Sequence, residues 1–276
     1  MNKFDTPLAE VRKSRSYPFL VAHRGTMGAN VPCNTMAAFK IAVESGADVV
    51  ELDVATTLDG AHFVFHPGME PVFLGTRPIS EMTAAEVKEL RLRNADSAPT
   101  SYPVPTLREA LDYLKGKVYI NVDKFWTDVE GITREIREAG VEKQVIVKTF
   151  NDKESLDAVA KFAPDLMFMP LVRKTDTVTD GLIARGVNVI GAEILFETEE
   201  DEVISPAYIQ AMHDRGLLIW MNSIIYNEKD VISAHRTDDR SLVEGPEAGW
   251  GWMQDHGADF IQTDWIYPIK AYFEKK

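Results

Sequence analysis

The sequence contains a single cysteine, Cys33, among its 276 residues, so the chain cannot form an internal disulfide. It also lacks any uninterrupted apolar run of about 18 residues, the length that a membrane-spanning helix needs. Residues 1–18 are polar and mixed in charge, without the apolar core of a signal peptide. We therefore expect a cytoplasmic protein without a membrane span. A leader peptide that was removed before residue 1 is the alternative.

Positive charge is scarce, because 30 Lys and Arg residues face 43 Asp and Glu residues, for a net charge of -13. A field of this sign repels phosphate backbones, which argues against a nucleic acid as partner. A small anionic ligand would need a local cation in order to bind. A metal ion held by carboxylates would provide that cation and would account for part of the acidity.

Short apolar strands alternate with helical segments along the chain, which is the pattern of parallel βαβ units. Strands are predicted over residues 19–22, 48–55, 62–66, 118–123, 144–149, 166–171, 189–194, 217–222 and 260–264. Helices are predicted over residues 35–45, 83–92, 106–114 and 129–139, with others between the later strands.

About eight strand positions favour a TIM-type (β/α)₈ barrel over residues 1–276. The less regular residues 67–105 then form a small insertion after the second strand region. A doubly wound open sheet is the alternative. The glycine-rich loops that bind nucleotide phosphates in such sheets are absent, which weakens the nucleotide-binding form of that alternative.

Catalytic groups of a barrel lie at the carboxyl ends of its strands. Glu51 and Asp53 are two positions apart on the second strand and project to one side, opposite the apolar residues of that strand. Two carboxylates so close repel one another, and they must share a proton or bind a cation. With Asp123 as a third oxygen ligand, this set suits Mg²⁺ or Ca²⁺ better than Zn²⁺. A surface strand with solvated acids is the alternative.

Two histidines flank the acidic pair at strand ends: His23 after the first strand and His66 after an Asp-Gly turn. Imidazole titrates near neutral pH and can act as a general acid or base. We interpret the two as a catalytic pair, with structural hydrogen bonding as the alternative. The other histidines lie in mid-strand, helical or loop contexts and are expected to be structural: His62, His213, His235 and His256.

Three further side chains are candidates for substrate binding. Arg24 could donate a forked pair of hydrogen bonds to phosphate oxygens, or it could form a salt bridge to an acid at the barrel end. Lys148 ends the fourth barrel strand and could supply a second cation, or it could be solvated. Trp220, on the seventh strand, either forms a wall of the pocket or packs in the core.

A series of short motifs spans most of the chain: Ala22-His23-Arg24-Gly25, Asn34-Thr35, Gly46-Ala47-Asp48-Val49-Val50-Glu51-Leu52-Asp53-Val54, Thr57-Leu58-Asp59-Gly60, Met82-Thr83, Val104-Pro105-Thr106-Leu107 and the run 257–264. In order and spacing, the series resembles the glycerophosphodiester phosphodiesterase family.

The resemblance implies a TIM barrel with a small insertion and hydrolysis of glycerophosphodiesters to glycerol 3-phosphate and an alcohol. It implies that His23 and His66 are the acid–base pair. It also implies that Glu51 and Asp53 bind one divalent cation, with Asp123 where the family usually has glutamate.

The chain departs from the family pattern near the predicted site. Cys33 stands where the family has an acid, and Pro67 stands where it has aspartate. The family has a lysine two places after the acid at position 123. Here Phe125 stands at that position and the lysine, Lys124, comes one place earlier. We therefore expect Lys148 on the neighbouring strand to take the role of the family's lysine. These departures leave two alternatives open. One is a hydrolase or cyclising lyase for sugar- or inositol-type phosphodiesters, and the other is a barrel that binds a phosphorylated ligand without turnover.

Overall fold

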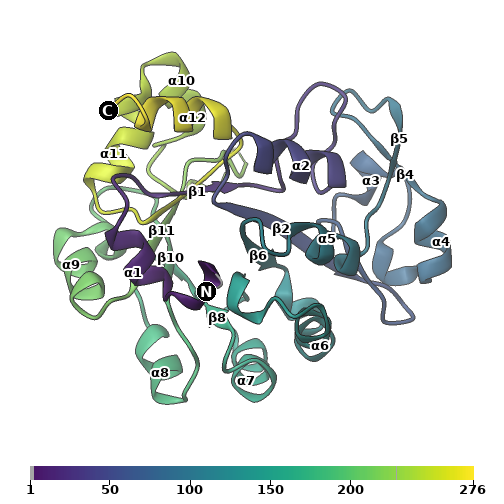
Figure 1. The fold of residues 1–276 in the computed structure, drawn as a ribbon, viewed down its shortest axis with the longest axis horizontal. Helices are drawn as coiled ribbons and strands as arrows, with labels where there is room; N and C mark the ends of the chain where they lie inside the picture. The colour runs from purple at the N-terminus through teal and green to yellow at the C-terminus, as the bar shows by residue number, and fades with distance from the viewer. Residues whose placement is uncertain (1–2, 228) are drawn as a thin grey trace.

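The computed structural model describes residues 3–227 and 229–276. Parallel strands form a curled sheet at its centre (Figure 1). They are β1 (Phe19–Ala22), β2 (Val49–Thr56), β6 (Tyr119–Asp123), β7 (Val145–Val147), β8 (Met167–Phe168), β9 (Leu171–Arg173), β10 (Gly191–Leu195), β11 (Leu218–Asn222) and β12 (Phe260–Thr263). Their order across the sheet is β8-β7-β6-β2-β1-β12-β11-β10-β9.

The sheet closes on itself because β8 and β9 are two parts of one extended segment. β8 pairs with β7, and β9 pairs with β10 on the other side. The amides of Ile190 and Glu193 donate to the carbonyls of Phe168 and Pro170. Counting β8 and β9 as one position gives eight positions, which confirms the predicted TIM-type barrel. The strand expected over residues 166–171 is therefore split into two.

Helices surround the barrel (Figure 1). They are α2 (Met36–Glu44), α5 (Leu107–Leu114), α6 (Val129–Ala139), α7 (Lys153–Phe162), α8 (Thr179–Ala184), α9 (Pro206–Asp214), α10 (Asp238–Val243), α11 (Trp250–Asp255) and α12 (Ile266–Phe273), with short 3₁₀ turns η3 (Phe125–Thr127), η4 (Glu142–Gln144), η5 (Glu202–Ile204) and η6 (Pro246–Ala248). Thr35 and Thr106 cap α2 and α5 by accepting hydrogen bonds from backbone amides of the first turn. Among the described residues, no helix combines the length and apolar character needed to cross a membrane.

Two apolar clusters stabilise the barrel. The larger includes outward-facing residues of the strands, such as Leu52, and inward-facing residues of the helices, such as Leu111 and Ile132. The smaller contains strand residues of the other face, such as Trp220. The amino-terminal segment, η1 (Lys3–Asp5) and α1 (Leu8–Lys13), contributes Phe4 to the smaller cluster and so covers one end of the barrel.

The predicted insertion lies to one side of the barrel, at the right of Figure 1. β3 (His62–Val64) runs antiparallel to β2 and leads into it. The insertion contains α3 (Glu70–Phe73), η2 (Ile79–Glu81), α4 (Ala84–Glu89) and the antiparallel pair β4 (Arg91–Arg93) and β5 (Pro99–Pro103).

The helix predicted over residues 83–92 was too long. α4 ends at Glu89, and Leu90 is extended, with a ψ of 152°. Residues 91–93 alternate between arginine and leucine, with Leu92 buried, which suits the strand β4. The hairpin with β5 provides strand pairing that local helix propensity does not reveal.

Candidate active site

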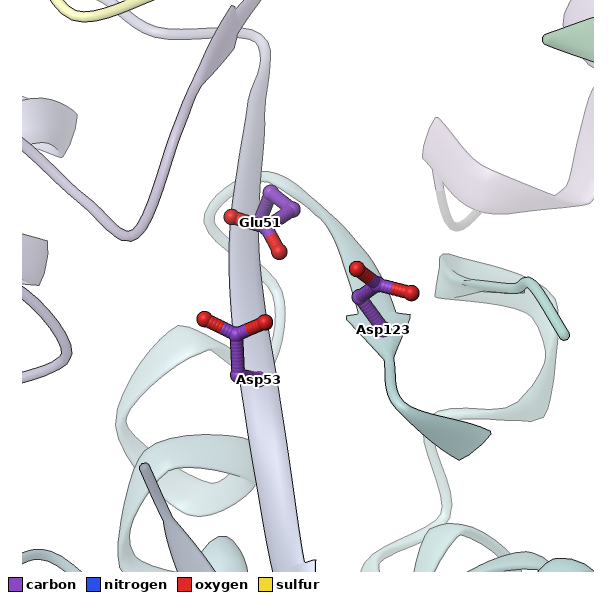
Figure 2. Close-up of side chains that lie close together, drawn as sticks. All are labelled: Glu51, Asp53 and Asp123. Atoms are coloured by element: carbon purple, nitrogen blue, oxygen red, sulfur yellow. The ribbon is translucent and has the colours of Figure 1, made fainter. Parts of the chain in front are cut away.

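Neighbouring strands β2 and β6 bring the three predicted carboxylates together. Their parallel register aligns Glu51 with Asn121 and Asp53 with Asp123. One oxygen from each of Glu51, Asp53 and Asp123 lies within 4.8 Å of the others. Figure 2 shows the two β2 carboxylates beside that of Asp123. Glu51 and Asp53 are buried, and the prediction that they face inward while the apolar side chains of β2 face the helices is confirmed.

The two carboxylates of β2 differ in proton affinity. Burial raises the pKa of Glu51 well above its usual range, and the negative charges of Asp53 and Asp123 add to this rise. Burial would also raise the pKa of Asp53, but the cations of Arg24 and Lys124 hold it below its usual value. The arrangement therefore keeps Asp53 ionised and leaves Glu51 short of positive charge.

Arg24 contacts both of these acids. Its backbone amide donates to Glu51 Oε2 at 2.7 Å, and its guanidinium Nε lies 3.0 Å from Asp53 Oδ2. A positive φ of 56° at Arg24 allows backbone and side chain to turn toward the same site. Of the two interpretations from the sequence, the salt bridge is observed, and contact with phosphate stays a prediction.

The residues after the first strand add contacts that the sequence analysis missed. Asn34, with a φ of 56°, donates from Nδ2 to Asp53 Oδ2 at 2.8 Å. Cys33 is buried beside it, and burial raises the pKa of its thiol to about 11. The thiol therefore stays neutral, and Asn34 fixes the Asp53 carboxylate by a hydrogen bond.

Lys124 takes the place that was expected for Lys148. Its φ of 58° turns the ammonium back toward the site, where Nζ lies 2.7 Å from Asp123 Oδ2 and 3.3 Å from Asp53 Oδ1. The left-handed turn therefore brings Lys124 to the acidic cluster although it directly follows Asp123 in the chain. Phe125, at the family's lysine position, is fully buried.

The placement of Lys148 and Trp220 differs from the prediction that they bind substrate. Lys148 is 2% exposed, and its Nζ lies 2.5 Å from Glu193 Oε2 and 3.1 Å from the Trp220 ring centroid. Burial lowers the pKa of Lys148, and the Glu193 carboxylate opposes that shift. Trp220 is stacked on Phe260 in the smaller apolar cluster. A cavity of about 540 Å³ at the carboxyl ends of the strands contains the predicted site. Neither Lys148 nor Trp220 is among the described residues that line it.

The two predicted catalytic histidines each have a partner at Nδ1. His23 Nδ1 lies 2.9 Å from Asp264 Oδ1, and His66 Nδ1 lies 2.8 Å from the carbonyl oxygen of Pro67. Because a carbonyl only accepts, His66 must carry a proton on Nδ1, which leaves Nε2 as the acceptor of a neutral ring. This buried Nε2 has no hydrogen-bond partner among the described residues. Burial also lowers the pKa of His66, which favours the neutral ring.

Asp238, which the sequence analysis did not single out, holds the residue that contacts His23. Its Oδ2 accepts from the backbone amide of Asp264 at 2.9 Å. Its Oδ1 accepts from Ser223, Trp250 and Thr263 at 2.6–2.7 Å. An Asp-Asp pair at the start of a short helix is too common a pattern to predict such a network.

A cavity of about 540 Å³ opens at the carboxyl ends of the strands. One side of it is polar, with His23, Arg24, Glu51, His66, Asp123 and Lys124 in its lining. A larger cavity, of about 840 Å³, lies at the opposite end beside Phe4 and Leu8. It is lined by none of the predicted site residues, so we place the chemistry in the smaller one.

Comparison with known proteins agrees with this geometry. Residues 23–221 match the model of the glycerophosphoryl diester phosphodiesterase family. A glycerophosphodiester phosphodiesterase from Caldanaerobacter subterraneus subsp. tengcongensis is 33% identical over 156 residues, which cover 53% of this chain and 63% of that protein. The chain therefore spans less than two thirds of the length of this relative.

Solved structures show the same fold. A glycerophosphoryl diester phosphodiesterase from Parabacteroides distasonis has a TM-score of 0.74 and 22% identity, over 98% of this chain and 92% of that one. A phosphodiesterase from Oleispira antarctica, solved with its product sn-glycerol-3-phosphate, has a TM-score of 0.65 and 17% identity, over 94% of this chain and 97% of that one. Because the family model matches more than half of the sequence, this chain belongs to the glycerophosphoryl diester phosphodiesterase family.

Proposed function

We propose that this protein hydrolyses glycerophosphodiesters to glycerol 3-phosphate and an alcohol by two-histidine acid–base catalysis. The observation that carries the proposal is that His23 and His66 line one cavity together with Glu51 and Asp123 of the acidic cluster. The family match supports a phosphodiester as substrate. The Oleispira antarctica relative, solved with sn-glycerol-3-phosphate as product, supports the same products here.

The acidic cluster suits a hard divalent cation. Glu51, Asp53 and Asp123 offer oxygen ligands alone, as Mg²⁺ and Ca²⁺ prefer. Asp53 Oδ1 receives no hydrogen bond from the described part of the chain, and the Lys124 ammonium lies 3.3 Å from it. Glu51, Asp53 and Asp123 would hold the ion, which would supply electrostatic stabilisation of the charge on the phosphate oxygens.

The surroundings of the histidines suggest separate roles. His66 is held neutral with Nε2 as acceptor, so it serves as the base that takes a proton from the attacking water. His23 is held at Nδ1 by the Asp264 carboxylate 2.9 Å away, which orients the ring in the cavity. With His66 as the base, His23 serves as the acid that protonates the leaving alkoxide, and Arg24 and Lys124 balance the charge of the diester.

The test is turnover of glycerophosphocholine by the full chain with Mg²⁺ or Ca²⁺, followed by phosphorus NMR, with an EDTA control. His23→Ala and His66→Ala should each lower kcat by about 10²–10⁴-fold, the usual contribution of a positioned acid or base. His256→Ala is the matched control, because His256 is exposed, its ring bonds the Trp252 carbonyl and stacks on the Trp252 ring, and it is outside the described cavity lining. Near-wild-type turnover by either site variant would end the proposal.

The same spectra separate the alternatives. Free glycerol 3-phosphate supports hydrolysis, whereas a persistent cyclic phosphate would indicate a cyclising lyase. Turnover of sugar or inositol phosphodiesters, without turnover of glycerophosphodiesters, would indicate that the substrate is a sugar- or inositol-type phosphodiester. Binding of diesters without any turnover would indicate a non-catalytic barrel.

A further inference from the structure

The site cavity has two chemically different sides. The catalytic side chains come from the ends of β1, β2 and β6 and from the segment after β3. The other side is formed from the ends of β9 to β11, η3 and the loop after β7. Its apolar lining includes Trp126, Phe150, Leu171, Leu195, Ile224 and Tyr226. We call these six residues the apolar wall.

Part of the apolar wall is exposed to solvent. Phe150 is 55% exposed and Tyr226 is 52% exposed, although both rings are large and apolar. The Phe150 ring centroid lies 3.8 Å from that of Trp126, so the two rings form one surface. Exposed apolar surface that continues into a cavity marks a place where apolar ligand surface becomes buried.

The apolar wall is continuous with the catalytic side. Lys124 Nζ lies 5.2 Å from the Trp126 ring centroid, and the same ammonium contacts Asp53 and Asp123. A phosphodiester bound at the acidic cluster would therefore extend along Trp126 toward Phe150. The cavity volume of about 540 Å³ is in the range of sites for drug-sized ligands, so a glycerol phosphate unit would fill only part of it.

The charges beside the apolar wall do not select a cationic ligand. Lys124 lies next to Trp126, and Arg173 lines the same side of the cavity. Both cations have acid partners: Lys124 contacts Asp53 and Asp123, and Arg173 lies 3.6 Å from Glu197 and 4.0 Å from Asp230. A quaternary ammonium, which aromatic surfaces can bind, is therefore kept as a separate outcome of the test.

We propose that the apolar wall is a subsite for an alkyl or acyl chain, so that the site prefers lipid-like phosphodiesters to fully deacylated ones. This inference rests on the proposed phosphodiesterase function. The chain can belong to the leaving alcohol or to the glycerol of a lysophospholipid. Both place the same apolar surface against Trp126, Phe150 and Tyr226.

The test compares kcat/KM for the glycerophospho-esters of ethanol, butanol and hexanol, with glycerophosphocholine beside them. A second arm compares hexanoyl-lysophosphatidylcholine with glycerophosphocholine, which places the chain on the glycerol. All substrates are used below their aggregation concentrations. In at least one of the two arms, kcat/KM should be at least about tenfold higher for the substrate with the six-carbon chain, through a lower KM. The half-open apolar wall buries part of the added methylene groups.

Phe150→Ser and Tyr226→Ser should each reduce the hexyl-to-ethyl ratio, or the matching lysolipid ratio, by several-fold. Tyr267→Ser is the matched control, because Tyr267 on α12 is 73% exposed and outside the cavity lining; the ratio should stay at the wild-type value.

Equal kcat/KM for all chain lengths in both arms would overturn the inference and leave the proposed function intact. A preference for glycerophosphocholine over every chain-bearing substrate would overturn it in favour of a cationic alcohol. Absence of turnover with every diester would overturn both proposals.

Discussion

Lys124 Nζ lies 2.7 Å from Oδ2 of Asp123, the residue directly before it in the chain. Side chains of adjacent strand residues normally point to opposite faces, so this contact depends on the left-handed backbone at Lys124. The same ammonium lies 3.3 Å from Asp53 Oδ1 on β2. Lys124 therefore links the carboxylates of two strands in the lining of the site cavity.

We expect Lys124→Met to lower kcat/KM for a glycerophosphodiester by roughly 10–100-fold, since a charge-assisted contact in a buried site contributes about 1.5–3 kcal/mol. Lys124→Arg should retain part of the activity, because arginine keeps the positive charge but differs from lysine in side-chain length and geometry. Steady-state kinetics at saturating metal measure the effect. The control is Lys153→Met, because Lys153 is solvated and pairs only with Asp157 among the described residues. Wild-type kinetics for Lys124→Met would show that its ammonium has no part in binding or turnover.

Asp264 should matter through His23. Asp264→Asn replaces the carboxylate acceptor with an amide that can donate to Nδ1 and so reverse the proton position on the ring, and kcat should fall by about 10²–10⁴-fold while KM changes little. The pH–rate profile should change shape on its acid–base limb, which a purely structural role would not produce. A KM effect without a kcat effect would contradict the positioning role.

The acidic cluster predicts stabilisation by metal. Three carboxylates with oxygens within 4.8 Å repel one another, and an ion bound only by the folded chain lowers that repulsion. At 100 times its Kd, such an ion adds about 2.7 kcal/mol, or roughly 5 °C in Tm for a chain of this size. Thermal unfolding of EDTA-treated protein with added Mg²⁺ or Ca²⁺ tests this. Asp123→Asn should lose most of the shift, and the exposed Asp239→Asn should keep it.

His62 predicts a pH dependence of stability away from the site. Burial would lower the pKa of His62, but its contacts with Glu135 at 2.7 Å and Asp128 at 3.2 Å raise it above the usual 6.5. The protonated ring therefore stabilises the folded state fully below the unfolded pKa, and this contribution is lost as pH rises through the folded pKa. Urea unfolding should show His62→Gln to be destabilised by about 1.5–3 kcal/mol at pH 5.5.

That deficit should shrink as the pH rises to 9. His213 also has a raised pKa, but its contribution cancels because the wild type and the variant share it. A deficit that stays constant between pH 5.5 and 9 would show that His62 acts through packing alone.

The sequence allowed the barrel and the acidic pair to be predicted because both depend on simple periodicities. Residues two apart on a strand share a face, so Glu51 and Asp53 could be placed together and inward. The predictions that differ from the structure concern residues at backbone turns and buried charged side chains. A non-glycine residue with positive φ, as at Asn34 and Lys124, is selected by tertiary contacts that no local pattern shows.

Lys148 illustrates a second limit. A lysine at a strand end suggests a group that reaches ligand or solvent, yet here it is buried against Glu193 from a strand far along the chain. Such a pair becomes visible only when the barrel brings β7 and β10 within reach. The hairpin of β4 and β5 was missed for the same reason, because its pairing is set by the insertion's own contacts.

The four hydrogen bonds accepted by Asp238 join the ends of β11 and β12 to α10 and α11. The Asp238 network tolerates few substitutions, since each would leave a buried donor unpaired. Phe150 and Tyr226 lie in loops outside this network, and about half of each residue is exposed. In the proposed site, substitutions at Phe150 and Tyr226 can therefore change substrate preference without disturbing the Asp238 network. A library limited to positions 150 and 226 should yield new substrate ranges at almost no cost in folding.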